Sequence, residues 1–205
     1  MGRKTKSLHR LARISLDLSA VESVAVLGEC MLELSAFDVK SPELKKLYFG
    51  GDTLNTAFYL ASSGQQVSYF TALGNDPQSH WMMRQWRKAG IDCSHVRNVA
   101  GRVPGLYMIE TDPAGERSFL YWRDNSPARE LFDDAQQSIE LFTELRKFEL
   151  VYLSGVTLSL YSDTALKALL DFLADYRRHG GLVAFDSNYR SERWPDPQRA
   201  QIIYE

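Results

Sequence analysis

The chain has 205 residues, of which 44% are hydrophobic and 24% are charged, values typical of one globular domain with a sizeable core. Its 24 Lys and Arg residues nearly balance 26 Asp and Glu residues, so the net charge of −2 gives no electrostatic reason to expect nucleic acid or a membrane as partner. The only cysteines, Cys30 and Cys93, do not make a disulfide framework, and we expect a cytoplasmic protein.

The beginning of the chain differs in character from the rest. Residues 1–13 carry five Lys or Arg side chains and no acid, and we expect residues 1–21 to be a disordered basic extension. Residues 22–205 then read as a single domain. Its first element is a buried strand at residues 24–27, followed by Gly28 and a carboxylate, Glu29.

The stretch from Gly50 to Ala57 is the most informative part of the sequence. It follows a polar, strand-like segment and opens a helix pattern. Two glycines, Gly50 and Gly51, allow a backbone to come close to a ligand, and Asp52 and Asn55 add a carboxylate and an amide at the helix start. A tight turn with an N-cap residue explains the same residues, and the local pattern leaves both the ligand-binding and the turn interpretation open.

The remaining elements alternate between strand and helix. Helices are predicted at 54–62, 78–89, 138–146 and 163–178, and strands at 67–72, 151–153 and 182–185. This alternation predicts an α/β fold whose mainly parallel sheet is covered by helices on both faces. Ligands collect at the carboxyl ends of such strands, where Glu29, Asp76, Ser154 and Asp186 fall.

A hairpin interrupts the alternation, with strands at residues 106–111 and 117–123 around a turn that contains Pro113 and Gly115. If Thr111 pairs with Arg117, then Tyr107 lies opposite Tyr121, and Arg123 shares their face. Two phenols and a guanidinium suit a sugar acid, because tyrosine offers a flat face with a hydroxyl and arginine matches a carboxylate. A sheet face with aromatic pairs and a solvated arginine is the alternative.

Taken in order, several of these motifs resemble the ribokinase-like (PfkB) family of carbohydrate kinases over about residues 22–195. The motifs lie at residues 24–29, 50–57, 69–76, 103–112, 115–123, 153–156 and 186–190. Tyr-Trp-Arg at 121–123 and Asn-Tyr-Arg at 188–190 favour the branch of the family that acts on 2-keto-3-deoxygluconate. The resemblance implies that residues 22–205 are an incomplete ribokinase-like domain with a small β-sheet lid, whose strands lie at about residues 36–50 and 103–123.

The resemblance also implies a set of site residues. Those matching positions that hold the sugar acid are Gly50, Gly51, Asp52, Asn55, Tyr107, Tyr121, Arg123, Val156 and Arg190. Asp186 and Asn188 match the edge shared with the nucleotide phosphates, although an Asx-rich turn after a strand explains them as well.

The implied reaction transfers the γ-phosphate of ATP, with Mg²⁺, to the primary hydroxyl of 2-keto-3-deoxygluconate and gives its 6-phosphate. In the family the catalytic aspartate and the ATP pocket come later than residue 205, and no G-x-G-D motif occurs in this chain. We therefore assign no catalytic residue and no metal ligand, and expect the chain alone to be inactive. The alternatives are an inactive remnant that binds a sugar acid, or a kinase for fructose or ribose. A homo-oligomer formed through the lid is a further expectation from the resemblance.

Overall fold

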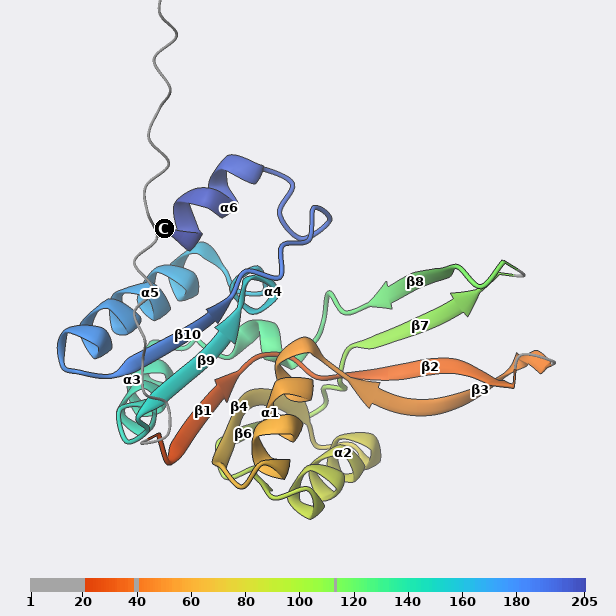
Figure 1. The fold of residues 1–205 in the computed structure, drawn as a ribbon, viewed down its shortest axis with the longest axis horizontal. Helices are drawn as coiled ribbons and strands as arrows, with labels where there is room; N and C mark the ends of the chain where they lie inside the picture. The colour runs from red at the N-terminus through yellow and green to blue at the C-terminus, as the bar shows by residue number, and fades with distance from the viewer. Residues whose placement is uncertain (1–20, 39–40, 113) are drawn as a thin grey trace, which may run out of the picture.

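A computed structural model describes residues 21–38, 41–112 and 114–205 of the chain (Figure 1). The predicted basic extension, residues 1–21, lies outside the described residues except for Val21. Within the described ranges, no helix combines the length and apolar character needed to cross a bilayer.

The body of the molecule is built on a parallel sheet with the strand order β10-β9-β1-β4-β5, and β6 pairs with the far end of β4. All the pairings in this sheet are parallel. The carboxyl ends of the strands therefore meet at one edge, as the sequence predicts. The strands are β1 (Ser23–Leu27), β4 (Gln66–Gly74), β5 (Ile91–Asp92), β6 (Val96–Val99), β9 (Leu150–Ser154) and β10 (Leu182–Asp186).

Helices cover both faces of this sheet, which confirms the predicted α/β fold (Figure 1). Val24 and Val26 of β1 belong to the core under α1 (Asp52–Ser62) and α2 (Pro77–Lys88). The alternate residues Ala25 and Leu27 belong to the core under the helices of the other face. This alternation is the period-2 pattern of a strand buried on both sides, and each fully buried aliphatic side chain contributes about 1.5–3 kcal/mol. The second face carries α3 (Ala135–Leu145), α5 (Asp163–Arg178) and α6 (Pro197–Tyr204).

A second, four-stranded sheet projects from the body and is called the lid below (Figure 1). Its order is β3-β2-β7-β8, in which β2 pairs antiparallel with β3 and parallel with β7. The predicted hairpin register is confirmed, because Thr111 pairs with Arg117 and Tyr107 with Tyr121. The lid includes five residues before the predicted start near 36. Its strands are β2 (Met31–Asp38), β3 (Ser41–Gly50), β7 (Leu106–Thr111) and β8 (Arg117–Trp122).

Capping side chains set several helix ends. The α5 helix occupies the predicted residues 163–178, and the Ser162 hydroxyl accepts a hydrogen bond from the Ala165 N–H at 3.3 Å. The α3 helix begins at Ala135, three residues before the prediction, because the Asp134 carboxylate caps it by accepting from the Gln137 N–H at 2.8 Å. Two short helices, η2 (Pro127–Glu130) and α4 (Gly155–Leu158), complete the fold.

Candidate functional site

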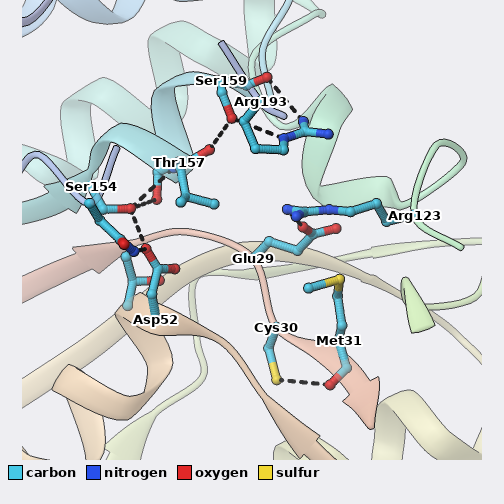
Figure 2. Close-up of polar contacts among 12 residues, drawn as sticks. Glu29, Cys30, Met31, Asp52, Arg123, Ser154, Thr157, Ser159 and Arg193 are labelled. Atoms are coloured by element: carbon cyan, nitrogen blue, oxygen red, sulfur yellow. Dashed lines mark hydrogen bonds and ion pairs between the residues drawn. The ribbon is translucent and has the colours of Figure 1, made fainter. Parts of the chain in front are cut away.

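Asp52 joins three segments at the carboxyl edge of the parallel sheet. It is the first residue of α1 and follows Gly50, which ends β3, and Gly51, the N-cap residue of α1. Its Oδ2 accepts a hydrogen bond from Ser154 Oγ at 2.6 Å (Figure 2). It accepts a second one from Asn188 Nδ2 at 2.8 Å. Because Ser154 ends β9 and Asn188 follows β10, the carboxylate is held at the point where ligands bind in sheets of this kind.

The glycine pair allows β3 to return close to the end of β1. A Cβ atom on Gly51 would collide with the carbonyl oxygen of Glu29, and one on Gly50 would collide with the Tyr107 hydroxyl. The close approach that the sequence suggested is therefore present, but the partner is the protein's own backbone and lid. Contact between these glycines and a sugar stays a prediction.

The other predicted residues of the body lie around this edge. Asn55 is one turn after Asp52 on α1, and its exposed side chain shares that face of the helix. Val156 is half-buried in α4, the helix that directly follows β9. Arg190 is exposed in the loop between β10 and α6, where its carbonyl oxygen accepts from the N–H groups of Arg193 and Trp194.

The lid brings the predicted aromatic cluster together on one face. The ring centroids of Tyr107 and Tyr121 are 6.0 Å apart, and the Arg123 guanidinium lies 5.8 Å from the Tyr121 ring. Phe119 extends this face by stacking on Tyr121 with centroids 6.3 Å apart. Tyr107 donates a hydrogen bond to the Glu33 carboxylate. Burial and this carboxylate raise the pKa of Tyr107, so that its hydroxyl stays protonated at neutral pH.

Arg123 also makes an ion pair that the sequence prediction missed. Its Nη2 donates to Oε2 of Glu29, which follows β1, so the pair fastens the lid to the body (Figure 2). Only 3% of Glu29 and 8% of Arg123 are exposed. Glu29 Oε1 and Arg123 Nε are buried without a hydrogen-bond partner among the described residues. The sequence placed Glu29 at a strand end but could not pair two residues that are 94 positions apart.

Asp186 and Asn188 form a turn at the end of β10. The Asn188 N–H donates to Asp186 Oδ1 at 3.0 Å, so the Asx turn weighed as an alternative is present. Asn188 has a φ of 28°, in the left-handed region where asparagine is favoured over most residues. This backbone conformation accompanies the Nδ2 bond to Asp52, while the Asp186 side chain stays exposed at the sheet edge.

Two hydroxyl residues that the prediction left out of the site hold this edge together. The Ser154 hydroxyl accepts from the Thr157 N–H at 3.1 Å, and so caps α4. Thr157 Oγ1 in turn donates to the carbonyl oxygen of Leu27, the last residue of β1, at 3.2 Å. The sequence could have indicated Ser154 only through its position at a strand end. The helix that it caps has four residues and is too short to give a recognisable helix pattern.

The comparison with known proteins fits this geometry. Residues 21–203 match the family described as pfkB family carbohydrate kinase. The chain belongs to the pfkB family of carbohydrate kinases. It is 42% identical over 188 residues to the 2-dehydro-3-deoxygluconokinase of Escherichia coli strain K12, covering 90% of this chain and 59% of that protein. It is 38% identical over 187 residues to the enzyme of the same name from Dickeya dadantii, covering 89% and 59%.

Solved structures show the same pfkB fold. The crystal structure of 2-dehydro-3-deoxygluconokinase from Thermotoga maritima superposes with a TM-score of 0.72 at 26% identity, covering 89% of this chain and 56% of that one. A pfkB family carbohydrate kinase from Listeria grayi gives 0.75 at 22% identity, with coverage of 89% and 56%. The ribokinase-like fold prediction is therefore confirmed. The chain spans about three fifths of the length of its curated relatives, at 59% of each.

Proposed function

We propose that this chain forms the sugar-binding part and the lid of an ATP-dependent kinase that phosphorylates 2-keto-3-deoxygluconate, also called 2-dehydro-3-deoxygluconate, to its 6-phosphate. The observation that carries the proposal is the lid face on which Tyr107, Tyr121 and Arg123 lie together. The names of the relatives at 42% and 38% identity support the same substrate.

In this proposal the body binds the hydroxyl groups of the sugar. Asp52 Oδ2 is occupied by Ser154 and Asn188, whereas no partner of Oδ1 is recorded among the described residues. Oδ1 would accept a hydrogen bond from a sugar hydroxyl, and Asn55 would add its amide from the next turn of α1. The two neighbours of Oδ2 fix the orientation of the carboxylate, which lowers the entropy cost of binding.

The lid binds the acid end of the substrate. Tyr121 is 53% exposed and presents a ring face and a hydroxyl, and the neighbouring Arg123 brings guanidinium N–H groups beyond the one bound to Glu29. Val156 and Arg190 complete the proposed set from the body. Closure of the lid would exclude water, which competes with the sugar as the phosphoryl acceptor.

ATP and Mg²⁺, when bound, would supply the phosphoryl group and neutralise its charge. The residues of this chain that fit the phosphate edge are Asp186, an exposed carboxylate at the end of β10, and Asn188 beside it. We assign no general base to the described residues. The chain's own part is to hold and orient the sugar acid.

Calorimetric titration of the chain with 2-keto-3-deoxygluconate, with gluconate and fructose as controls, tests the proposal. We expect saturable binding of the keto-deoxy acid and at least about tenfold weaker binding of both controls, which corresponds to about 1.4 kcal/mol. Circular dichroism on the same sample confirms that the chain is folded. Equal binding of fructose by a folded chain would show that the acid group is not recognised.

A further inference from the structure

Arg193 lies in the loop between β10 and α6 and points toward the Glu29–Arg123 pair (Figure 2). Its side chain is half-buried. Its Nε donates to Ser159 Oγ at 3.2 Å, and its Nη2 donates to the Ser159 carbonyl oxygen at 3.2 Å. Both acceptors are neutral, so these hydrogen bonds hold the guanidinium in place without compensating its charge.

The charges around Arg193 leave an excess of positive charge. Glu29 neutralises Arg123 through their buried ion pair, and the described residues give Arg193 no carboxylate within ion-pair distance. Burial lowers the pKa of Arg193, and the positive charges of Arg123 and Arg129 lower it further, against the smaller effects of Glu29 and Asp124. An anion placed among these guanidinium groups would therefore be stabilised.

A sugar acid approaching Arg123 meets a specific obstacle. The carboxylate of Glu29 is already bound to this arginine and is almost fully buried, so it repels a second carboxylate at short range. Arg123 with Glu29 is close to neutral as a unit, so Arg123 can still donate N–H groups to a carboxylate but adds little net charge that would favour an acid over its neutral analogue. A further cation beside the pair, in addition to the exposed Arg190 proposed above, would strengthen such a preference.

We propose that Arg193 is this cation, and that it makes the sugar site selective for a carboxylate beside the Glu29–Arg123 pair. The inference rests on the proposed function, which it deepens by naming a residue that distinguishes acids from neutral sugars. Arg123 Nε is buried and has no hydrogen-bond partner in the described part of the chain, so the charge cluster holds an N–H group that the protein itself leaves unsatisfied.

The test compares one ligand pair across matched variants. The ligands are 2-keto-3-deoxygluconate and its C1 primary amide, which have nearly the same shape, although the amide is neutral and carries an NH2 donor in place of one carboxylate oxygen. The method is isothermal titration calorimetry. Arg193→Gln removes the charge and Arg193→Lys keeps it. Arg199→Gln is the control, because Arg199 lines the same cavity as Arg193 but pairs with Asp163 at the surface.

We expect Arg193→Gln to weaken binding of the acid about 10- to 100-fold and binding of the amide less than about 2-fold. Arg193→Lys should recover most of the loss, and Arg199→Gln should match the wild type. If Arg193→Gln does not unfold cooperatively, Arg193→Met, which keeps an apolar stem of similar length, replaces it. An unchanged ratio of acid to amide affinity in the folded variant would overturn the role of Arg193.

The acid and amide affinities of the wild-type chain distinguish a failure of this inference from a failure of the proposed function. A wild type that binds acid and amide equally contradicts the sugar-acid function, and the role of Arg193 falls with it. A wild type that prefers the acid, together with an Arg193→Gln variant that keeps the preference, leaves the proposed function standing and overturns only Arg193.

Discussion

Removing one partner of the Glu29–Arg123 pair should destabilise the chain strongly. Both side chains are more than nine-tenths buried, so Arg123→Met leaves the Glu29 carboxylate charged and unpaired inside the protein. Breaking a buried pair in this way costs about 3–5 kcal/mol. That is a large part of the total stability of about 5–15 kcal/mol expected of a domain. For a chain of this size the cost corresponds to a fall in Tm of about 6–20 °C.

A double variant distinguishes the pair from ordinary packing. Replacing both charges with apolar side chains in Glu29→Leu/Arg123→Met removes the unpaired buried charge. The double variant should therefore be more stable than either single variant. Urea unfolding followed by circular dichroism gives the free energy of unfolding of each, with a check that the m-value is unchanged.

The exposed pair of Lys167 and Asp171 on α5 provides a matched control. Their side chains are 76% and 67% exposed, and Lys167→Met should cost only about 0.3–0.5 kcal/mol. The reasoning is refuted if Arg123→Met costs as little as this control, or if the two changes in the double variant simply add. Either result would mean that Glu29 and Arg123 are solvated or do not meet in the folded chain.

Three further predictions concern the site and the body. Gly51→Ala should lower the free energy of unfolding by at least about 3 kcal/mol, because the new Cβ meets the Glu29 carbonyl oxygen. Gly64→Ala should cost only about 1–2 kcal/mol, because Gly64 has open space around it and only its φ of 92° is unfavourable for alanine. Urea unfolding measures both. Tyr121→Phe should weaken sugar-acid binding less than Tyr121→Ala, because it keeps the ring, and titration calorimetry would contradict the lid's role if both variants bound like the wild type. Asp76→Ala should cost about 1 kcal/mol at pH 7. Burial raises the pKa of Asp76, but hydrogen bonds from Ser79 and Gln78 outweigh it, and the net shift is downward. The contribution of this carboxylate is therefore fully present above about pH 3.9 and is lost as the pH falls further, so wild-type and variant stabilities should converge in acid.

Much of the fold could be predicted because its signals are local. The period-2 pattern of β1 and the apolar stripe of α5 are each contained in one segment, and the hairpin register followed from one pairing of Thr111 with Arg117. The start of α3 was predicted three residues too late. The helix pattern over its first residues is weak, and the Asp134 carboxylate that caps the helix there was not taken into account.

The site was harder to predict because its contacts join distant segments. Tyr107, Tyr121 and Arg123 were grouped correctly since one hairpin carries all three. The partner of Arg123 comes from the end of β1, and the partners of Asp52 come from β9 and the loop after β10. Such pairings depend on the strand order of the sheet, which no single segment encodes.

A crystal structure of the chain with 2-keto-3-deoxygluconate would test the central claim most directly. We expect the sugar to lie between the lid and the carboxyl edge of the parallel sheet. Its hydroxyl groups should be within hydrogen-bond distance of Asp52, and its carboxylate should lie against Arg123. A sugar bound elsewhere, or bound with its carboxylate turned away from the lid, would contradict the account.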